Sequence, residues 1–364
     1  MKRTVFYSLA ILFLIPALLW SQQTTQNDDG LQQAVQKLAK SVAQSYVAPV
    51  TSGFGVNLNS GWFHRAPWAE MIGFDLEFGV VGMATVFGDA QRSFSTNGDF
   101  SFDYDQADFL ATQAGVPAQF QADVRNAIMA QQFQVSFKGP TVVGSKDDHV
   151  QILFPGKDIT VNYSGGGSGT YSLPSQTFTL EVNGALGDPK ALPLVAPQLT
   201  IGTFLGSQLT FRYLPEVKLD DQIGSLKYFG FGIQHNPMVW FDTELPFEVS
   251  LGYFTQSLKV GSLMDAEASA FGVNSSIRLG WGFLNLTPYV GFMLEKSSIN
   301  FAYDYTFTGP ANTPVTDRIE FTTTGENTSR FVVGASIKIL IINVNADMNF
   351  GKYKAISIGA MIII

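Results

Sequence analysis

The dominant pattern of this chain is an alternation of apolar and polar residues. Near the C-terminus, the even positions are occupied by Ile342, Val344, Ala346, Met348 and Phe350, and the odd positions by asparagine, aspartate and glycine. Successive side chains of a β-strand point to opposite faces, so this period of two predicts a strand with one apolar and one polar face. The chain ends on the same pattern, with isoleucine at positions 356, 358, 362 and 364.

The same period recurs in most of the chain after residue 53. A short run alternates from Phe54 to Asn59, and longer segments follow. They are IGFDLEFGV (72–80), SQLTFRYLP (207–215), YFGFGIQ (228–234), PFEVSLGYF (246–254), FGVNSSIRLGW (271–281), LNLTPYVGFMLE (284–295), INFAYDYTF (299–307) and RFVVGASIKIL (330–340). Many of these segments are about nine to twelve residues long, which is the length that a tilted strand needs to cross a bilayer.

Two segments instead show helical spacing. Apolar residues at steps of three and four between Leu31 and Tyr46 predict an amphipathic helix that ends near Pro49, after a polar leader. In the less regular region 88–206, Pro117 precedes apolar residues spaced by four, which predicts a second helix. Region 88–206 has three interpretations at this point: a plug, a long extracellular insertion, or an irregular part of a barrel wall.

Composition indicates that much of the surface does not face water. Only 14% of the residues are charged, compared with roughly 25% in ordinary soluble domains, and the chain contains 35 glycines and 31 phenylalanines. The net charge of −8 argues against a nucleic-acid partner. The absence of cysteine excludes disulfides and thiolate metal sites.

The N-terminus has the layout of a secretory signal peptide. Lys2 and Arg3 precede an apolar run that extends to Trp20, and the small residue Ser21 follows. We therefore expect residues 1–21 to be a signal peptide, residues 22–50 to be the leader and helix, and residues 51–364 to form the main domain.

The composition of the polar faces indicates which side of the strands meets lipid. Their residues are mostly neutral or small, as expected of an enclosed and partly wet lumen rather than of a solvated exterior. The apolar faces carry aromatic residues that we expect near the ends of strands, at the level of the lipid headgroups: Tyr213, Tyr253, Trp281 and Tyr353. The prediction is an all-β transmembrane antiparallel barrel of about 14 strands (range 12 to 16) in the outer membrane.

The segment GFGVNLNSGWFHRA after the helix, followed by IGFDLEFGVV, resembles an uncharacterised family of bacterial outer-membrane β-barrels. More distantly, a leading helix, an irregular early insertion and many strands resemble the long-chain fatty-acid transporters of the outer membrane. That resemblance implies passage of hydrophobic solutes through a plugged barrel. The chain lacks the Asn-Pro-Ala signature of these transporters near the mature N-terminus, and it ends on Ile364 rather than on an aromatic residue.

Motifs for catalysis or metal binding are weak. His64, His149 and His235 lie in no nucleophile motif, and GxSxG is absent. The acidic cluster of Asp103, Asp105 and Asp108 misses the spacing of a calcium loop, which favours a solvated acidic loop. The run GGGSG (165–169) lacks the lysine of a phosphate-binding loop and is typical of a linker or hairpin tip. We expect neither enzymatic activity nor a cofactor or metal.

Eight charged residues fall on predicted lumen positions and are the candidate site residues. They are Asp75, Glu77, Arg212, Glu248, Arg278, Glu295, Lys338 and Asp347. One interpretation is a field that lines a pore and biases permeation toward cations. The preferred interpretation is a network of mixed sign that fills and braces the lumen.

These features predict passive transport of small or hydrophobic solutes. The alternative is a closed structural or adhesive barrel. The expected partners are outer-membrane lipid, the barrel-insertion machinery and hydrophobic small molecules.

Overall fold

The computed structural model describes residues 40–220, 224–242, 245–281, 283–308 and 314–364. These residues divide into two compact units: residues 48–88 with the chain from 189 onward, and residues 40–47 with 89–188. The expected signal peptide and the start of the predicted helix lie outside the described residues.

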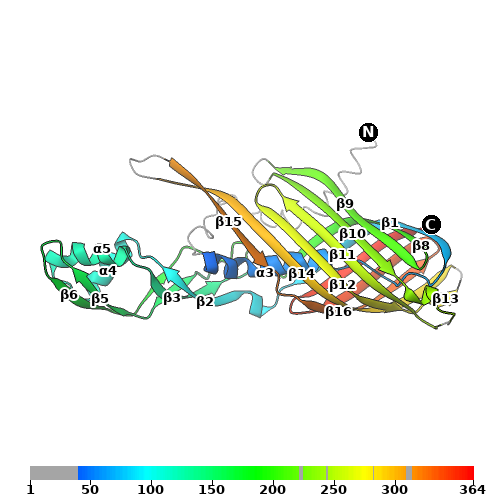
Figure 1. The fold of residues 1–364 in the computed structure, drawn as a ribbon, viewed down its shortest axis with the longest axis horizontal. Coiled ribbons are helices and arrows are strands. Elements are labelled where there is room, and N and C mark those ends of the chain that lie inside the picture. The colour runs from blue at the N-terminus through cyan, green and yellow to red at the C-terminus, as the bar shows by residue number, and fades with distance from the viewer. Residues whose placement is uncertain (1–39, 221–223, 243–244, 282, 309–313) are drawn as a thin grey trace. The chain divides into compact units, whose positions relative to one another are not determined.

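The first unit is a closed antiparallel β-barrel (Figure 1). Ten strands form the ring, and each pairs with a neighbour on both sides. The pairings of β12 with β14 and of β18 with β1 close the ring. In ring order they are β1 (Ile72–Val86), β8 (Ala191–Phe204), β9 (Ser207–Asp220), β10 (Gly224–His235), β11 (Glu248–Val260), β12 (Met264–Ser276), β14 (Leu284–Thr308), β16 (Ser329–Ile339), β17 (Ile342–Phe350) and β18 (Lys354–Ile363).

Three short or additional elements complete this unit. Strand β13 (Leu279–Trp281) pairs with the start of β14, and β15 (Pro314–Thr324) pairs with its end. The 3-10 helix η3 (Pro237–Trp240) follows β10. The expected count of about 14 strands is not confirmed, partly because β14 is a single strand of 25 residues that contains both LNLTPYVGFMLE and INFAYDYTF.

The predicted assignment of the two strand faces is confirmed. In β17, Val344 and Met348 are 48% and 49% exposed, whereas Asn343 and Asn345 are 1% and 3% exposed. The isoleucines of β18 at positions 356, 358 and 362 also point outward. The barrel therefore has an apolar exterior and a largely polar interior along these strands. Tyr353 departs from the expected aromatic girdle, because it is buried in the turn between β17 and β18.

Helix α3 (Lys40–Asn59) differs from both sequence expectations for this region. It does not end near Pro49 but continues through it, and the alternating run from Phe54 to Asn59 is helical rather than extended. Burial on several sides explains the false strand signal, since residues 55–60 are all buried. Among the described residues, no helix combines the length and apolar composition that a membrane crossing requires.

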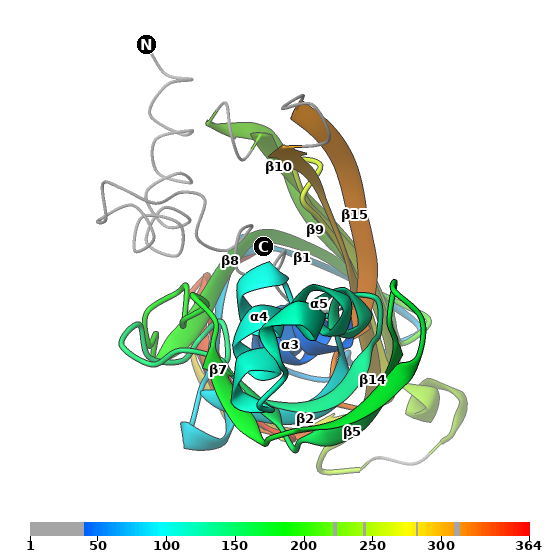
Figure 2. The ribbon, with the colours of Figure 1, turned by 90° about the vertical axis from the view of Figure 1, so that its left-hand side faces the viewer.

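The second unit contains two small antiparallel sheets and two helices. One sheet has the order β2 (Ser93–Phe100), β3 (Phe133–Pro140), β4 (Gln151–Phe154) and β7 (Gln176–Thr179); the other pairs β5 (Lys157–Asn162) with β6 (Ser168–Leu173). The helices are α4 (Tyr104–Gln113) and α5 (Gln121–Met129), with the 3-10 turns η1 (Asp89–Gln91) and η2 (Ala118–Phe120). In Figure 2, α4 and α5 lie within the curve of β2, β5 and β7.

An aromatic cluster forms the core of the second unit. The ring of Phe102 lies 5.3 Å from the rings of Phe133, Phe154 and Phe178, and Phe109 of α4 contacts Phe178. Residues 89–188 therefore fold around a core of their own instead of forming irregular barrel wall, whereas residues 191–204 do belong to the wall as β8.

Three local predictions in this unit have clear outcomes. The helix after Pro117 is confirmed as α5, and GGGSG lies at the β5–β6 hairpin. The acidic cluster is not a loop, because α4 starts there. Asp103 is the N-cap of α4: its carboxylate accepts a hydrogen bond from the Gln106 backbone N–H, and the Gln106 side chain accepts one from the Asp103 N–H.

Candidate functional site: the barrel interior

The chain itself occupies the interior of the barrel. We call residues 48–68, which comprise the end of α3 and the loop after it, the inner segment. Residues 55–60 and 62–67 of this segment are all buried, including the large side chain of Trp62. A helix and loop outside the barrel would expose these side chains to solvent. Their burial therefore shows that the strands enclose the segment.

The start of the inner segment is held at the barrel end that carries the connection after β15. The hydroxyls of Thr51 and Thr323 lie 2.6 Å apart, and Ser52 Oγ accepts a hydrogen bond from the Glu326 N–H at 3.1 Å. Further along the helix, Asn57 Nδ2 donates to the carbonyl of Leu192 at 2.7 Å. These bonds connect the helix to strands on two sides of the barrel.

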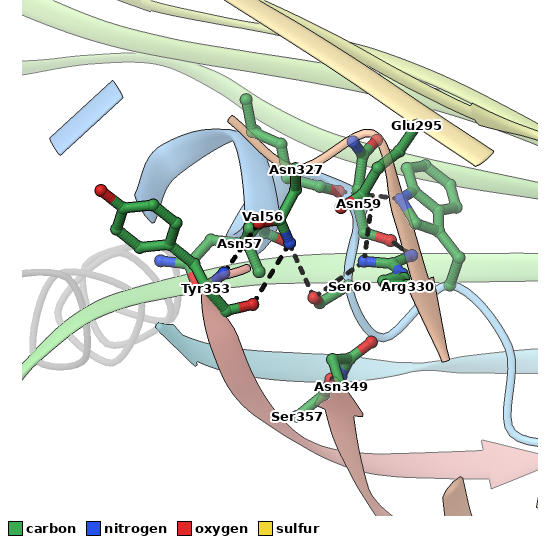
Figure 3. Close-up of polar contacts among 12 residues, drawn as sticks. Val56, Asn57, Asn59, Ser60, Glu295, Asn327, Arg330, Asn349, Tyr353 and Ser357 are labelled. Carbon is green, nitrogen blue, oxygen red and sulfur yellow. Dashed lines mark hydrogen bonds and ion pairs between the residues drawn. The ribbon is translucent and has the colours of Figure 1, made fainter. Parts of the chain in front are cut away.

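A second group of polar contacts surrounds the end of α3 (Figure 3). Arg330 of β16 donates hydrogen bonds to the Asn59 carbonyl and, at 3.0 Å, to Ser60 Oγ. Its guanidinium also lies 3.4 Å from the carboxylate of Glu295 on β14, and both side chains are 1% exposed. Arg330 thus satisfies a helix C-terminus and a buried carboxylate together, at a site where an unpaired charge would be costly.

Arg212 of β9 holds the turn that follows α3. Its Nη1 donates to the Ser60 carbonyl at 2.9 Å, and its Nε donates to Gln198 Oε1 at 2.9 Å. The guanidinium carbon lies 4.1 Å from the centre of the Trp62 ring, which adds a cation–π contact. Arg212 is completely buried.

The far end of the inner segment is held by a second cluster of charges. Arg65 forms ion pairs with Asp75 and Glu77 of β1, and His64 Nε2 lies 3.4 Å from Glu77. The backbone is also fixed here, because the Ala66 N–H donates to Ser276 Oγ at 3.0 Å. Contacts at both ends therefore hold the inner segment along the length of the barrel.

The interior is polar in some parts and apolar in others. A buried apolar cluster includes residues of eight wall strands and Leu58 of the inner segment. Its wall residues are Val81, Met83, Leu194, Ala196, Leu214, Leu226, Tyr228, Leu258, Met264, Ala266, Ala268, Ile299 and Met361. A water-filled pore would not be lined by so many aliphatic groups.

The eight candidate charges have different environments. Glu77, Arg212, Glu295 and Asp347 are buried, and Asp75, Glu248 and Lys338 are half-buried. Arg278 is exposed, with its guanidinium carbon 4.5 Å from the centre of the Trp68 ring. Asp347 accepts hydrogen bonds from Tyr289 and Ser357. That these residues line a pore stays a prediction.

The sequence analysis missed two arginines that fix the inner segment in the barrel, one on the segment itself and one on the wall. Arg65 and Arg330 were not among the candidates, although Arg330 lies on the same face of its strand as Lys338, which was. Extending the period of two by four more steps along β16 would have found Arg330. No sequence signal identifies Arg65, because its partners Asp75 and Glu77 depend on how the loop enters the barrel.

One histidine has a serine neighbour, which calls for a test as a catalytic pair. His235 Nδ1 lies 2.9 Å from Ser207 Oγ, and Trp240 Nε1 donates to His235 Nε2 at 3.1 Å. Because Nε2 accepts a hydrogen bond, the neutral ring carries its proton on Nδ1 and donates to the serine. His235 in this state is unable to take the serine proton, so the geometry does not support a nucleophile and base.

The whole chain, residues 1–364, matches the profile of DUF6588, a family of unknown function. The chain belongs to this family. A search of curated proteins finds no match. The anticipated resemblance to long-chain fatty-acid transporters is not shown by these comparisons.

Several solved structures of membrane barrels overlap with the chain at low similarity. The crystal structure of outer membrane protease OmpT from Escherichia coli has 9% identity and a TM-score of 0.27, over 81% of this chain and 99% of that one. The outer membrane channel DcaP of Acinetobacter baumannii has 9% identity and a TM-score of 0.18, over 82% and 100%. A BenF-like porin from Pseudomonas fluorescens Pf-5 has 10% identity and a TM-score of 0.18, over 84% and 100%. Superpositions at this level carry no argument about activity.

Proposed function

We propose that this protein is an integral outer-membrane β-barrel that passes small hydrophobic solutes and is closed to water and ions by its own inner segment. The observation that carries the proposal is the apolar exterior. Every strand of the ring presents a large apolar side chain that is at least about a third exposed: Phe78, Ile201, Leu209, Phe229, Leu251, Phe271, Phe292, Val333, Val344 and Ile358.

Such an exterior is unfavourable in water. Soluble monomers rarely expose continuous apolar patches of more than a few hundred Å². A band of phenylalanine, leucine, isoleucine and valine around a closed ring is the arrangement that lipid stabilises. Closure of the ring supports the same proposal, because a bilayer disfavours unpaired strand edges.

The composition of the barrel interior favours the passage of hydrophobic solutes over the passage of ions. The inner segment uses the polar lumen groups as hydrogen-bond partners, for example Arg330, Arg212 and Gln256. The remaining interior includes the large aliphatic cluster around Leu58. A permeating ion would have to replace many buried hydrogen bonds, whereas an apolar molecule would meet a surface of its own polarity.

Reconstitution into liposomes tests the proposal. We expect the folded protein to give no steady ionic conductance but to accelerate the transfer of a fluorescent fatty acid from the external solution to the vesicle. Vesicles with a ten-stranded barrel of known impermeability provide the control. Stable ionic conductance, or fatty-acid transfer no faster than in the control, contradicts the proposal.

A closed adhesive barrel is the second candidate, and one observation favours it. The second unit has an open groove of about 760 Å³ on the outer face of its four-stranded sheet, whose lining combines the polar side chains of Asn97, Gln134, Ser136 and Thr177 with apolar ones such as Leu153 and Phe154. Amides and hydroxyls of this kind suit a polar surface ligand. Binding of cells or glycan arrays by the protein, together with no solute transfer, would favour this candidate over transport.

A further inference from the structure

Strand β2 of the second unit is paired on one side only. It pairs with β3 over its whole length without a register shift, and among the described residues no strand pairs with its other side. The Thr141 N–H donates to the Arg92 carbonyl just before the strand, so the even-numbered residues of β2 bond to β3. The odd-numbered residues therefore point their backbone N–H and C=O groups toward the free side.

The free side of β2 carries a row of backbone groups without backbone partners in the described part of the chain. They belong to Ser93, Ser95, Asn97 and Asp99, whose side chains are exposed. The side chain of Asn97 accepts a hydrogen bond from the Ser136 hydroxyl of β3 at 2.7 Å. Since it is held toward β3, it leaves the backbone of the free side accessible.

The usual protections of a sheet edge are absent from β2. The strand SFSTNGDF contains no proline or lysine, and its ladder with β3 has no bulge. The edge on the opposite side of the sheet is different, because β7 has only four residues and follows Pro174. Strand β2 is thus the long, regular edge of this sheet, and such an edge is a template for an added strand.

The core side of β2 is also incompletely covered. Phe94 and Phe100 of β2 are half-buried, whereas Phe133 and Phe137 on the neighbouring β3 are buried. A further strand beside β2 would remove apolar surface of both half-buried rings from water.

We propose that β2 is the docking strand for a second copy of this chain. In this dimer the β2 strands of the two copies lie antiparallel, and a two-fold axis passes beside Thr96. The inference goes beyond the proposed transport function and does not depend on it. The resulting sheet would continue through both copies, with about eight backbone hydrogen bonds across the new ladder.

The exposed face of β2 is complementary to itself in this register. Pairing of the odd-numbered residues places Ser95 opposite Asn97 of the second copy, and Ser93 opposite Asp99. Hydroxyl groups thus face an amide and a carboxylate, which accept hydrogen bonds. Asp99 is the only charged residue of β2, so no like charges lie opposite each other.

The core face is complementary in the same register. Thr96 lies opposite Thr96 of the second copy, and Phe94 lies opposite Gly98. Cross-strand threonine pairs stabilise sheets, and an aromatic ring covers the backbone that a glycine leaves bare. Two paired strands of eight residues cover less area than the roughly 1,200 Å² of a standard stable interface, so we expect a reversible dimer.

A single cysteine at the axis tests the dimer. The chain has no cysteine, and Thr96 with its symmetry mate forms a pair whose Cα atoms lie about 4.5 Å apart, within reach of a disulfide. Under mild oxidation of the folded protein in detergent, we expect T96C to form disulfide-linked dimers at least ten times faster than T179C. Thr179 is an exposed residue of β7, so T179C measures random collisions.

A proline on the free side distinguishes strand pairing from other contacts. Asn97→Pro removes one donor of the free side and leaves the ladder with β3 intact, because odd-numbered residues do not bond to β3. We expect T96C/N97P to cross-link at least tenfold more slowly than T96C. The matched control T96C/N97A lacks the same side chain but keeps the donor, and should cross-link at the rate of T96C.

Two results would overturn the proposal: cross-linking of T96C no faster than that of T179C, or an unchanged rate in T96C/N97P. Sedimentation equilibrium in density-matched detergent gives a second readout without cysteines. The mass of the wild-type protein should rise with concentration, and that of N97P should stay monomeric. Equal resistance of the second unit to limited proteolysis verifies that the variants fold. Failure of the dimer leaves the transport proposal untouched, because liposome transfer tests that proposal separately.

Discussion

The guanidinium of Arg330 lies 3.4 Å from the carboxylate of Glu295, and both side chains are almost completely buried inside the barrel. Arg330 also donates to the carbonyl at the end of α3 and to Ser60. One buried ion pair between two wall strands therefore also fixes the inner segment. Bonds of this kind explain how a barrel keeps a helix in its interior.

Removal of one partner of this pair should be more harmful than removal of both. In Arg330→Met the Glu295 carboxylate is left buried without its counter-charge, at a cost of about 3 to 5 kcal/mol in the free energy of unfolding. The double variant E295Q/R330M should recover part of that loss. Denaturant unfolding in detergent, followed on a gel, measures both.

A solvent-exposed pair provides the control for this comparison. Lys352 Nζ lies 2.5 Å from the carboxylate of Glu326, but the lysine side chain is 62% exposed. Lys352→Met should change stability far less than Arg330→Met, because water screens an exposed pair. Equal effects of the two substitutions would mean that Arg330 is not a buried anchor.

Gly55 of α3 lies very close to the barrel wall. A Cβ at this position would overlap Oγ and Cβ of Ser297 on β14. Gly55→Ala should destabilise the protein by about 1 to 3 kcal/mol and loosen the inner segment, with transient ionic currents in planar bilayers.

A second substitution distinguishes steric overlap from altered helix propensity. Ser297→Gly removes both overlapping atoms, so the double variant G55A/S297G should show no transient ionic currents in planar bilayers. Gly165→Ala is the matched control, because a Cβ there meets nothing within 4 Å. Currents from the double variant as large as those from G55A would contradict the steric account.

The acidic cluster of the second unit should behave as a helix cap and not as a cation site. Asp103→Ala removes the carboxylate that accepts the Gln106 N–H bond and should cost about 1 kcal/mol. Asp105→Asn, in the first turn of the same helix, should cost much less. Thermal unfolding with and without calcium tests this; calcium stabilisation that disappears in the Asp103 variant would restore the metal interpretation.

Tyr46 should make the second unit sensitive to alkaline pH. Its hydroxyl donates to the Asn183 carbonyl at 2.7 Å, and burial raises the pKa of Tyr46 to about 12 from the ordinary value of 10.0. The folded state thus favours the neutral phenol. Stability is fully present below pH 10 and is lost as the pH rises toward 12, by about 2 to 3 kcal/mol in total.

Tyr46→Phe separates this group from the other tyrosines. The variant should be less stable at neutral pH, by about 1 to 2 kcal/mol, because the Asn183 carbonyl loses its donor. Its stability should then depend less on pH between 10 and 12 than that of the wild-type protein. Identical pH dependence of stability in both proteins would show that folding does not raise the pKa of Tyr46.

The strand faces were predictable because alternation is a local property. The inward orientation of Asn343 and the outward orientation of Val344 follow from their positions in the alternating pattern alone. The same holds for the outward orientation of Ile356 and Ile358. Strand number was less accessible, because the apolar positions change from even numbers up to Leu294 to odd numbers from Ile299, which looks like a break between two strands, yet Leu284 to Thr308 is one strand. The segment from Phe54 to Asn59 gave a wrong strand prediction for another reason. A helix that is buried on several sides does not show a hydrophobic period of 3.6.

The interior contacts were out of reach for a different reason. Arg330 meets Asn59 and Ser60 across more than 250 positions of the sequence, and nothing local in either segment specifies the other. The orientation of three prolines in the wall is an intermediate case. Pro193, Pro197 and Pro215 are visible in the sequence, but which neighbouring strand each one faces follows only from the register of the paired strands.

The central claim is that the apolar sides of the strands face lipid while the polar sides face an enclosed interior, and a spin-label scan of β17 tests it most directly. The chain has no cysteine, so single cysteines at positions 343 to 348 each give one labelled site. In liposomes we predict that labels at Val344, Ala346 and Met348 collide readily with oxygen dissolved in the bilayer, whereas labels at Asn343, Asn345 and Asp347 do not. Loss of this alternation, or its reversal, would contradict the account.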